Sequence, residues 1–225
     1  MSTHDFLVEL GTEELPPKAL KKLSAAFTSG VEQGLRDLGL NFGDVVSFAA
    51  PRRLAIQISA LEAQQADQEE VLYGPPAKIA FDADGKPTKA ALGFAARSGV
   101  DAAELKTAPD SDKKNAGKLM IERTIKGKQT IELLAGVVQS SLDKLPIPKR
   151  MRWGASRVEF VRPVQWLVML FGDSVVDGEV LGIKAGNQSK GHRFHAPGQI
   201  TLNNPSEYEA KLREAYVMAS FAERA

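Results

Sequence analysis

The N-terminal part of the chain changes from an apolar run typical of a strand to an amphipathic stripe typical of a helix. The run from His4 to Leu10 is mostly apolar and ends at a glycine, which predicts a short strand. Pro16 and Pro17 suit the first turn of a helix, where a missing backbone N–H costs little. The apolar residues that follow at helical spacing are Leu20, Leu23, Phe27, Val31, Leu35 and Leu38. This stripe predicts a helix that packs on a sheet, rather than a surface for a partner.

Two further strands and a polar boundary are predicted next. Val45–Ala49 and Leu54–Leu61 are apolar runs separated by the corner Pro51–Arg53. Residues 62–70 are polar and acidic, which favours a solvated turn or the edge of a sheet. Gly74–Pro76 predicts a rigid boundary, because its two prolines can neither continue a helix nor donate to a strand ladder.

The middle of the chain is predicted to contain two helices and one strand. A short helix is expected from Pro87 to Arg97, and the alternation around Leu119 and Ile121 predicts a strand. A second long helix is expected from Ile131 to Leu145, where apolar residues recur on one face.

The last third of the chain is predicted to be mainly β. Val164–Phe171 is an apolar run bounded by proline and glycine, which predicts a central strand buried on both faces. Val175–Ile183 is expected to be its hairpin partner. Asn204 is a suitable helix cap, so a final helix is expected to run to Ala219. No helix-stop signal precedes Ala225, and we interpret this as a sign of a longer protein.

Together these elements predict an α+β fold with a mixed sheet and flanking helices. Three segments are distinguished along the chain. They are an N-terminal α/β segment at residues 1–73, an inserted or second α/β segment at 74–145, and a β-rich segment with a final helix at 146–225. We expect them to form one compact unit, since 225 residues can bury one large core.

Composition excludes several classes of protein. The chain has no cysteine, so disulfides and thiolate metal sites are excluded. The N-terminus lacks the basic flank and apolar run of a signal peptide, and no apolar stretch is long enough to span a membrane. We therefore expect a cytoplasmic protein without a membrane partner. The net charge is only +1, so any affinity for nucleic acid must come from local clusters.

Acidic residues and histidines offer little catalytic chemistry. Glu9, Glu13 and Glu14 could act as acid and base, but carboxylates also favour the positive end of a helix, which is the interpretation we prefer. His192 and His195 lie three apart in a segment expected to be extended, so they should face opposite sides. The sequence has no nucleophile motif and no phosphate-binding glycine loop. We expect no catalytic residue, no metal and no cofactor in this chain.

A basic cluster with interleaved aromatic residues is the positive functional signal. Lysine and arginine neutralise phosphates and aromatic rings stack on bases, so such clusters are typical of nucleic-acid surfaces. Trp153 and Phe160 belong to this cluster, although they could equally belong to the core, and a smaller cluster surrounds Phe194. Arg152 and Arg162 are the members best suited to a structural role. The residues predicted to contact nucleic acid are Lys149, Arg150, Arg152, Arg157, Arg162, Lys190 and Arg193.

Seven short motifs follow one another in a recognisable order. They are Phe6–Pro17, Pro51–Leu54, Gly74–Pro76, Phe81–Ala90, Leu145–Gly154, Phe160–Leu167 and Ser189–His195. Each motif is weak alone, but their common order covers nearly the whole chain and is highly specific. In this order they resemble the N-terminal part of the beta subunit of bacterial heterotetrameric glycyl-tRNA synthetases.

This resemblance implies a role within a larger assembly of two alpha and two beta subunits. The alpha subunits would bind ATP and Mg²⁺ and attach glycine to tRNA(Gly). The beta subunit would contact tRNA(Gly) and the alpha subunit, which makes the basic residues above candidates for tRNA binding. The N-terminal region of such beta subunits is also similar to the editing-domain module of the phenylalanyl-tRNA synthetase beta subunit, which implies a mixed α and β fold.

Two other functions are consistent with the same sequence. One is a hydrolytic, editing-type domain that acts on mischarged tRNA, with Glu9, Glu13 or Glu14 as its polar groups. The other is an assembly module that contacts only protein. The basic cluster favours tRNA contact over pure assembly, and the lack of a nucleophile or metal set weakens the editing hypothesis.

Overall fold

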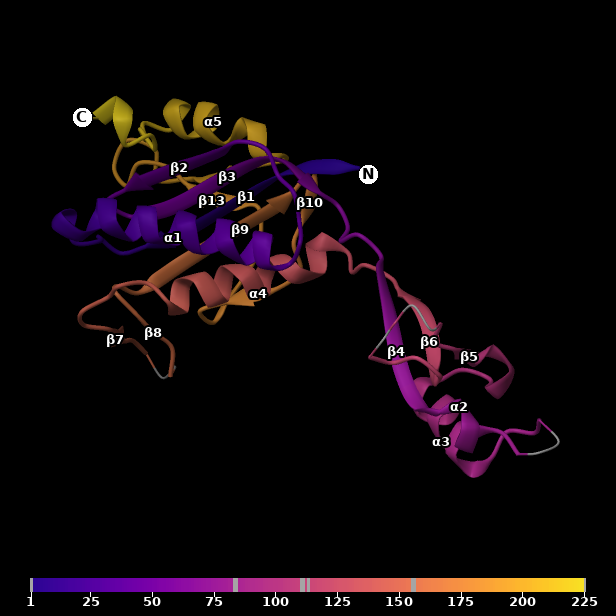
Figure 1. Ribbon diagram of the computed structural model, residues 1–225. Helices are drawn as coiled ribbons and strands as arrows, with labels where there is room; N and C mark the ends of the chain where they lie inside the picture. The colour runs from indigo at the N-terminus through magenta and orange to yellow at the C-terminus, as the bar shows by residue number, and fades with distance from the viewer. Residues whose placement is uncertain (1, 83–84, 110–111, 113, 155–156, 225) are drawn as a thin grey trace. The chain divides into compact units, whose positions relative to one another are not determined.

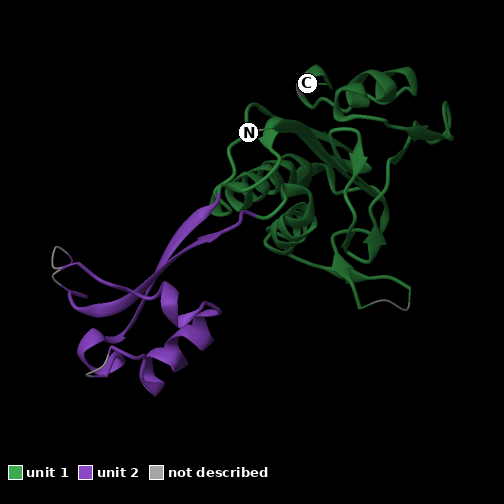
Figure 2. Ribbon diagram, turned by 90° about the vertical axis from the view of Figure 1, so that its right-hand side faces the viewer, with its two compact units in different colours: residues 1–66, 128–225 green, residues 67–127 purple. Residues whose placement is uncertain are grey.

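The computed structural model describes residues 2–82, 85–109, 112, 114–154 and 157–224. The described chain forms two compact units (Figure 2), both built from helices and antiparallel strands, as the α+β prediction required. Unit 1 comprises residues 1–66 and 128–225, and unit 2 comprises residues 67–127. No helix among the described residues is both long and apolar enough to cross a membrane.

Among the described residues, unit 1 is built on a five-stranded antiparallel sheet with the order β10-β9-β1-β3-β2 (Figure 1). Its strands are β1 (Thr3–Thr12), β2 (Val45–Ala50), β3 (Arg53–Glu62), β9 (Val164–Phe171) and β10 (Ser174–Val175). β1 lies at the centre, where residues 6–10 are completely buried. Every residue of β9 except Gln165 is buried, which confirms the prediction of a strand covered on both faces.

Helices α1 (Pro17–Asp37) and α4 (Thr130–Asp143) cover one face of this sheet (Figure 1). Alternate residues of a strand point to the same face, so Phe6, Val8 and Leu10 of β1 belong to this side. The residues that α1 buries are Leu20, Leu23, Phe27, Val31 and Leu35. The predicted amphipathic stripe therefore packs on the sheet, as expected.

The C-terminal part of the chain covers the opposite face, to which Leu7, Glu9 and Gly11 of β1 belong. The elements on this side are the 3-10 helix η2 (Pro205–Glu207) and helix α5 (Tyr208–Glu214). The buried residues of this segment are Leu202, Tyr208, Leu212 and Ala219. The central sheet is therefore enclosed on both sides.

The last helix is shorter than predicted. Asn204 caps η2 as expected, since its side chain accepts the backbone N–H of Ser206 at 3.1 Å. α5 ends at Glu214 instead of continuing to Ala219, and a short 3-10 helix, η3 (Ala222–Arg224), follows. The helix stops because Tyr216 adopts a left-handed backbone conformation, with φ 58°.

Small hairpins surround the main sheet. Their strands are β7 (Met151–Arg152) with β8 (Glu159–Phe160), β11 (Glu179–Val180) with β12 (Ile183–Lys184), and β13 (Gln188–Lys190) with β14 (Gln199–Thr201). The predicted continuous partner strand from Val175 to Ile183 is wrong, because pairing with β9 stops after Val175. Leu181 and Gly182 have positive φ angles of 51° and 77°, and they turn the chain back on itself.

Unit 2 has its own sheet and its own small core. Its strands, in the order β4-β6-β5, are β4 (Gln68–Pro76), β6 (Lys118–Ile125) and β5 (Lys106–Thr107). Its helical elements are α2 (Ala77–Ala80), α3 (Lys89–Ser98) and the 3-10 helix η1 (Ala102–Glu104). Ala80, Ala91 and Leu119 form the buried core. The predicted short helix and the predicted strand at Leu119 are both present.

The unit boundaries fall after residues 66 and 127, rather than after residues 73 and 145 as expected. Gly74–Pro76, predicted to be a rigid boundary, forms the end of β4, and α2 begins directly after it. A Cβ added to Gly74 would lie 2.6 Å from a ring carbon of Phe94, so this segment packs closely on α3. Helix α4, expected in the middle segment, belongs to unit 1 because it packs with α1.

Gly11 is a position of β1 that tolerates no side chain. A Cβ added there would lie 1.9 Å from Cε2 of Trp166, which crosses over it from β9. We expect Gly11→Ala to lower the free energy of unfolding by about 1–3 kcal/mol in urea denaturation. Gly136 in α4 has no atom within 4 Å of its Cβ position, so Gly136→Ala should raise that free energy by about 0.5–1 kcal/mol. Equal effects of the two substitutions would contradict this packing.

Candidate functional site

A carboxylate with no exposed surface, that of Glu9, lies in the middle of β1. Arg53 of β3 donates to its Oε2 at 3.1 Å, and Tyr208 of α5 donates to the same oxygen at 2.5 Å. Ser189 of β13 donates to Oε1 at 2.6 Å, and the indole N–H of Trp166 donates to this oxygen as well. Each partner comes from a different element, so Glu9 connects the sheet to the C-terminal segment that covers it.

Gly11 provides the space in which two of these partners meet. In the strand register it lies opposite Arg53 on one side and opposite Trp166 on the other. Because glycine has no side chain, the indole ring lies across β1, and Cζ of Arg53 stacks 5.5 Å from the ring centre. Lys190 also contacts Arg53 and Trp166. Its carbonyl accepts a hydrogen bond from Nη2 of Arg53 at 2.5 Å, and its Nζ lies 5.1 Å from the centre of the Trp166 indole ring.

Burial and pairing set the protonation states of this network. Burial lowers the pKa of Arg53, but the charge of Glu9 and the contact with Tyr208 outweigh it, so the net pKa is raised. Burial raises the pKa of Tyr208 well above its usual value, and the charge of Glu9 raises it further. Arg53 therefore stays charged and Tyr208 stays neutral near pH 7, so both donate to Glu9.

This network corrects the interpretation of the acidic cluster. Glu9 lies neither in an open cleft nor at a helix end, since it is enclosed and paired with Arg53. Helix α1 has no acidic residue in its first turn. Glu13 forms an ion pair with Arg52 at 3.6 Å, and Glu14 is exposed. These three carboxylates therefore do not converge on a common site.

The partners of Glu9 were not among the predicted site residues. A signal for them existed, because a single charged residue inside an apolar strand requires a buried partner. The sequence does not show which residues serve, since the partners lie between 44 and 199 positions away along the chain.

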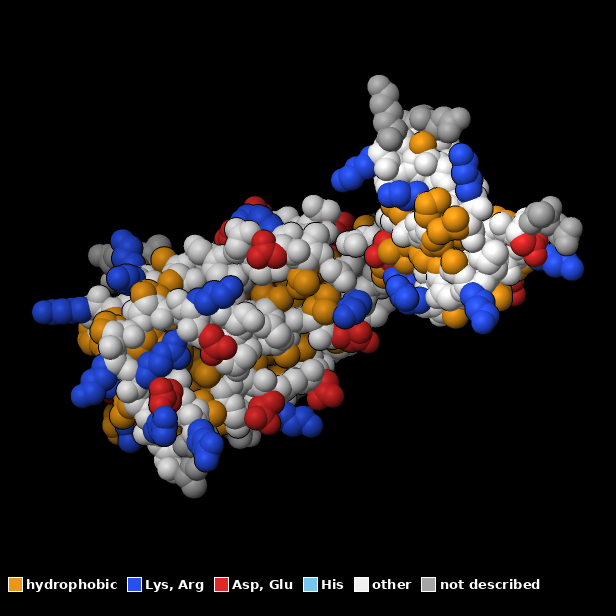
Figure 3. Space-filling view, turned by 60° about the horizontal axis from the view of Figure 1, so that its bottom comes forward, with side chains coloured by type: hydrophobic (Ala, Val, Ile, Leu, Met, Phe, Trp, Pro, Cys, Tyr) orange, Lys and Arg blue, Asp and Glu red, His pale blue; other side chains and the backbone are white. Residues whose placement is uncertain are grey.

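The β7–β8 hairpin carries the first part of the predicted basic cluster. Lys149 and Arg157 are exposed, and no described residue forms a hydrogen bond or ion pair with either. Arg152 is paired across the hairpin with Glu159, at 2.5 Å between Nε and Oε1. Figure 3 shows Lys and Arg side chains at the end of unit 1 that carries this hairpin.

A depression of about 490 Å³ lies beside the hairpin. Arg150 forms part of its wall and donates to the carbonyl of Asp143, at the end of α4, at 2.7 Å. The charged residues that line the depression are Asp143, Arg150, Arg152, Arg157, Glu159 and Glu179. The lining therefore contains three basic and three acidic residues. Lys149 lies outside this lining, and Arg157 belongs to it but forms no ion pair with a described residue.

The other predicted basic residues have different surroundings. Arg162 donates from Nε to the carbonyl of Glu14 at 3.0 Å, and thus ties the hairpin to the segment before α1. Lys190 lies against Trp166 in the buried network. Arg193 is exposed, with its Cζ 5.8 Å from the ring centre of Phe194. The structure therefore does not bring the seven basic residues together on one surface.

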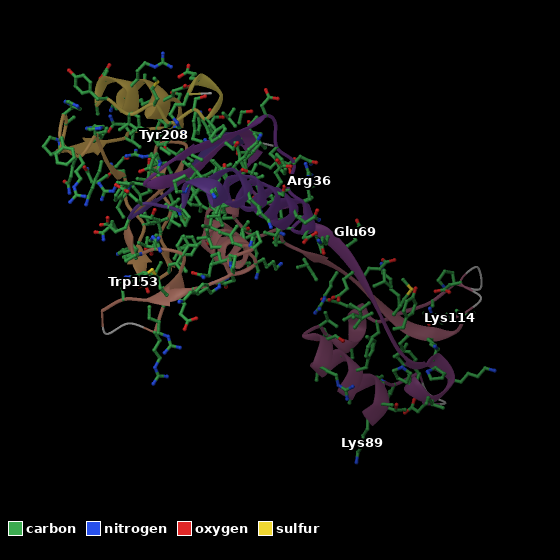
Figure 4. All side chains as sticks on the ribbon, turned by 90° about the vertical axis from the view of Figure 1, so that its left-hand side faces the viewer. Arg36, Glu69, Lys89, Lys114, Trp153 and Tyr208 are labelled. Atoms are coloured by element: carbon green, nitrogen blue, oxygen red, sulfur yellow. The ribbon has the colours of Figure 1, made fainter. Side chains whose placement is uncertain are left out.

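The aromatic residues and histidines also differ from the prediction. Phe160 is fully buried in the main core, and Trp153 packs against that core beside the hairpin (Figure 4), so these rings belong to the interior. His192 and His195 lie in a turn rather than an extended segment, and their ring centres are 4.6 Å apart. Within the described ranges, no group of three or more His, Asp or Glu residues could hold a metal ion.

Comparison with known proteins places the chain among subunits of aminoacyl-tRNA ligases. The family model described as Glycyl-tRNA synthetase beta subunit matches residues 6–225, so the chain belongs to this family, as its motifs predicted.

Similar curated proteins are the Glycine--tRNA ligase beta subunits of three bacteria. The chain is 56% identical to that of Stutzerimonas stutzeri (strain A1501), 57% to that of Ectopseudomonas mendocina (strain ymp) and 54% to that of Pseudomonas aeruginosa (strain LESB58). Each match covers 100% of the chain over 224 residues but 32% of the relative. The chain therefore spans about a third of the length of these relatives.

The buried ion pair predicts a large effect of neutralising Glu9. In Glu9→Gln, the amide cannot accept from all the donors around it, and the Arg53 charge is left buried without a counter-charge. We expect the free energy of unfolding to fall by about 3–5 kcal/mol. Glu13→Gln is the matched control: its ion pair with Arg52 is 41% exposed at the Glu13 side chain. Such a pair contributes about 0–1 kcal/mol. A loss below about 1 kcal/mol for Glu9→Gln would refute the network.

The raised pKa of Tyr208 predicts a dependence of stability on alkaline pH. The unfolded chain can ionise this phenol above about pH 10, while the buried phenol in the folded chain remains protonated. The unfolded state then binds fewer protons, so stability contributed by Tyr208 is fully present below pH 10 and is lost as pH rises. This loss approaches about 1.4 kcal/mol per pH unit above pH 10, and in Tyr208→Phe it should be absent from the unfolding free energies measured between pH 9 and 11. Identical slopes for the two proteins would contradict the assignment.

Proposed function

We propose that this chain is a tRNA-holding part of a glycine–tRNA ligase made of two alpha and two beta subunits. In this proposal the alpha subunits bind ATP and Mg²⁺ and attach glycine to tRNA(Gly), and this chain carries no catalytic residue. The observation that supports the proposal is the exposed basic hairpin β7–β8, in a chain whose family consists of tRNA ligase subunits.

The charges of this hairpin divide into two roles. Arg150 and Arg152 hold its shape through Asp143 and Glu159. Lys149 and Arg157 are exposed without such partners in the described structure, so they are the groups we expect to meet phosphates. Each phosphate contact would release condensed counterions, which favours binding and makes it dependent on salt.

A second proposed role is contact with the alpha subunit, for which unit 2 offers a surface. Ile79 of α2 and Leu92 of α3 are 59% and 49% exposed. Figure 3 shows hydrophobic side chains gathered on one face of unit 2, with Lys and Arg around them. Exposed apolar side chains with a polar rim are typical of a surface that binds protein.

Hydrolytic editing by the acidic cluster has less support. A carboxylate that activates water must be reached by substrate, but Glu9 has no exposed surface. The carboxylate of Glu13 forms an ion pair with Arg52. The proposal of tRNA contact therefore takes precedence over hydrolysis by these residues.

Charge reversal of Lys149 and Arg157 in the full-length enzyme tests the hairpin. The double variant Lys149→Glu, Arg157→Glu should bind tRNA(Gly) more weakly. The slope of log affinity against log salt should flatten by ~0.7–0.9 for each lost phosphate contact. The melting temperature should stay unchanged, because both side chains are exposed.

The matched control reverses two exposed lysines of α1, in the variant Lys21→Glu, Lys22→Glu. It changes the net charge equally but at a different place. If the hairpin variant shows the same tRNA affinity and salt slope as this control, the hairpin does not bind tRNA.

A further inference from the structure

A second surface of unit 1 presents aromatic rings to solvent. It consists of Arg193, Phe194, His195 and Tyr216, and we call it the aromatic turn. Phe194 is 81% exposed and Tyr216 is 68% exposed, which is unusual for large rings on an ordered segment. The first three residues lie between β13 and β14, whereas Tyr216 follows α5. The fold therefore brings two distant segments together at this surface.

The groups of the aromatic turn lie within stacking distance of one another. The ring centres of His195 and Tyr216 are 5.7 Å apart, and those of His195 and His192 are 4.6 Å apart. Cζ of Arg193 lies 5.8 Å from the ring centre of Phe194. The surface therefore presents several neighbouring aromatic rings and the guanidinium group of Arg193.

Hydrogen bonds hold the turn in this conformation. Nδ1 of His192 accepts the backbone N–H groups of Phe194 at 3.3 Å and His195 at 3.2 Å. The N–H of Ala196 donates to the carbonyl of His192 at 2.9 Å, and the N–H of His192 donates to the carbonyl of Ala215 at 2.9 Å. His192 thus has a structural role, and the neighbouring rings are pre-ordered in their exposed positions.

The charge around the turn indicates what covers it. Arg193 is the exposed cation at the turn, and the strands on either side of the turn, β13 and β14, contain no aspartate or glutamate. The acidic residues of α5 are Glu209, which forms an ion pair with Arg213 at 3.6 Å, and Glu214, which lines a depression beside the turn together with Lys211. A ligand that combines flat apolar faces with negative charge suits rings that are exposed next to a cation, as Phe194 is next to Arg193.

We propose that the aromatic turn binds unpaired nucleotides of RNA by stacking their bases on Phe194 and on the neighbouring rings. The bases of a duplex are already stacked on each other, so a single-stranded segment is required. This proposal rests on the proposed function, in which the chain contacts tRNA. It names a second contact site on the chain and specifies that the nucleotides bound there are unpaired, which the basic hairpin does not.

The test measures binding of two RNA probes to the full-length enzyme by fluorescence anisotropy. One probe is a single-stranded oligoribonucleotide, and the other is a blunt RNA duplex with the same number of phosphates. In Phe194→Leu the side chain stays apolar but has no ring to stack, so affinity for the single strand should fall ~5- to 150-fold. Affinity for the duplex should stay unchanged. Phe194→Trp should restore binding of the single strand.

Phe221→Leu is the matched control. Phe221 is also exposed, and Cζ of Arg224 also lies near its ring centre, at 5.6 Å, but Phe221 is not part of the aromatic turn. This control should bind both probes as the wild type does. Because Phe194 is largely exposed, its substitutions should leave the melting temperature unchanged.

Several outcomes would overturn the proposal. They are wild-type affinity of Phe194→Leu for the single strand, an equal loss for both probes, and a wild-type enzyme that binds tRNA but not the oligoribonucleotide. Loss of subunit assembly with unchanged RNA binding would identify a protein contact instead.

The hairpin variant is measured in parallel with tRNA(Gly). If it weakens tRNA binding while Phe194→Leu does not weaken single-strand binding, stacking fails but the proposed function stands. If the reverse is found, the hairpin role fails and the aromatic turn stands.

Discussion

The carboxylate of Glu9 imposes the strictest requirement on the fold of unit 1, because it lies in the central strand of the sheet and has no exposed surface. A charge removed from water costs several kcal/mol unless donors surround it. Arg53, Trp166, Ser189 and Tyr208 provide these donors, and they come from both neighbouring strands and from the C-terminal segment. The sheet and its outer covering layer are therefore stabilised together.

The same network determines where the exposed groups lie. Arg53 binds the carbonyl of Lys190, and Ser189 binds Glu9, so the end of β13 is fixed on the sheet. The aromatic turn begins directly after this strand, with Phe194 only a few residues further along the chain. A buried ion pair thus positions an exposed surface. For this reason a substitution in the network would disturb both stability and any ligand bound at the turn.

The basic residues illustrate how one residue type serves two purposes. Arg150 and Arg162 use their guanidinium groups to satisfy backbone carbonyls, and Lys190 lies over an indole ring. Lys149 and Arg157 extend into solvent. A list of cations along the chain cannot separate these groups, because the distinction depends on which acceptors the fold brings near each side chain. Their assignment to tRNA binding stays a prediction.

The sequence by itself determined several of the longer elements, such as α1, α4 and β9, and the family. Helix α1 and strand β9 follow from apolar spacing and from flanking prolines and glycines, which act over a few residues. The tertiary structure decided what depends on distant neighbours. Only the tertiary structure shows that residues 67–127 form a separate unit, that Glu9 is buried and paired with Arg53, and that the rings of His192 and His195 lie side by side. The physical reason is that local periodicity shows which side of an element is buried, whereas the identity of a charge's partner depends on strand register and on packing between segments far apart in the chain.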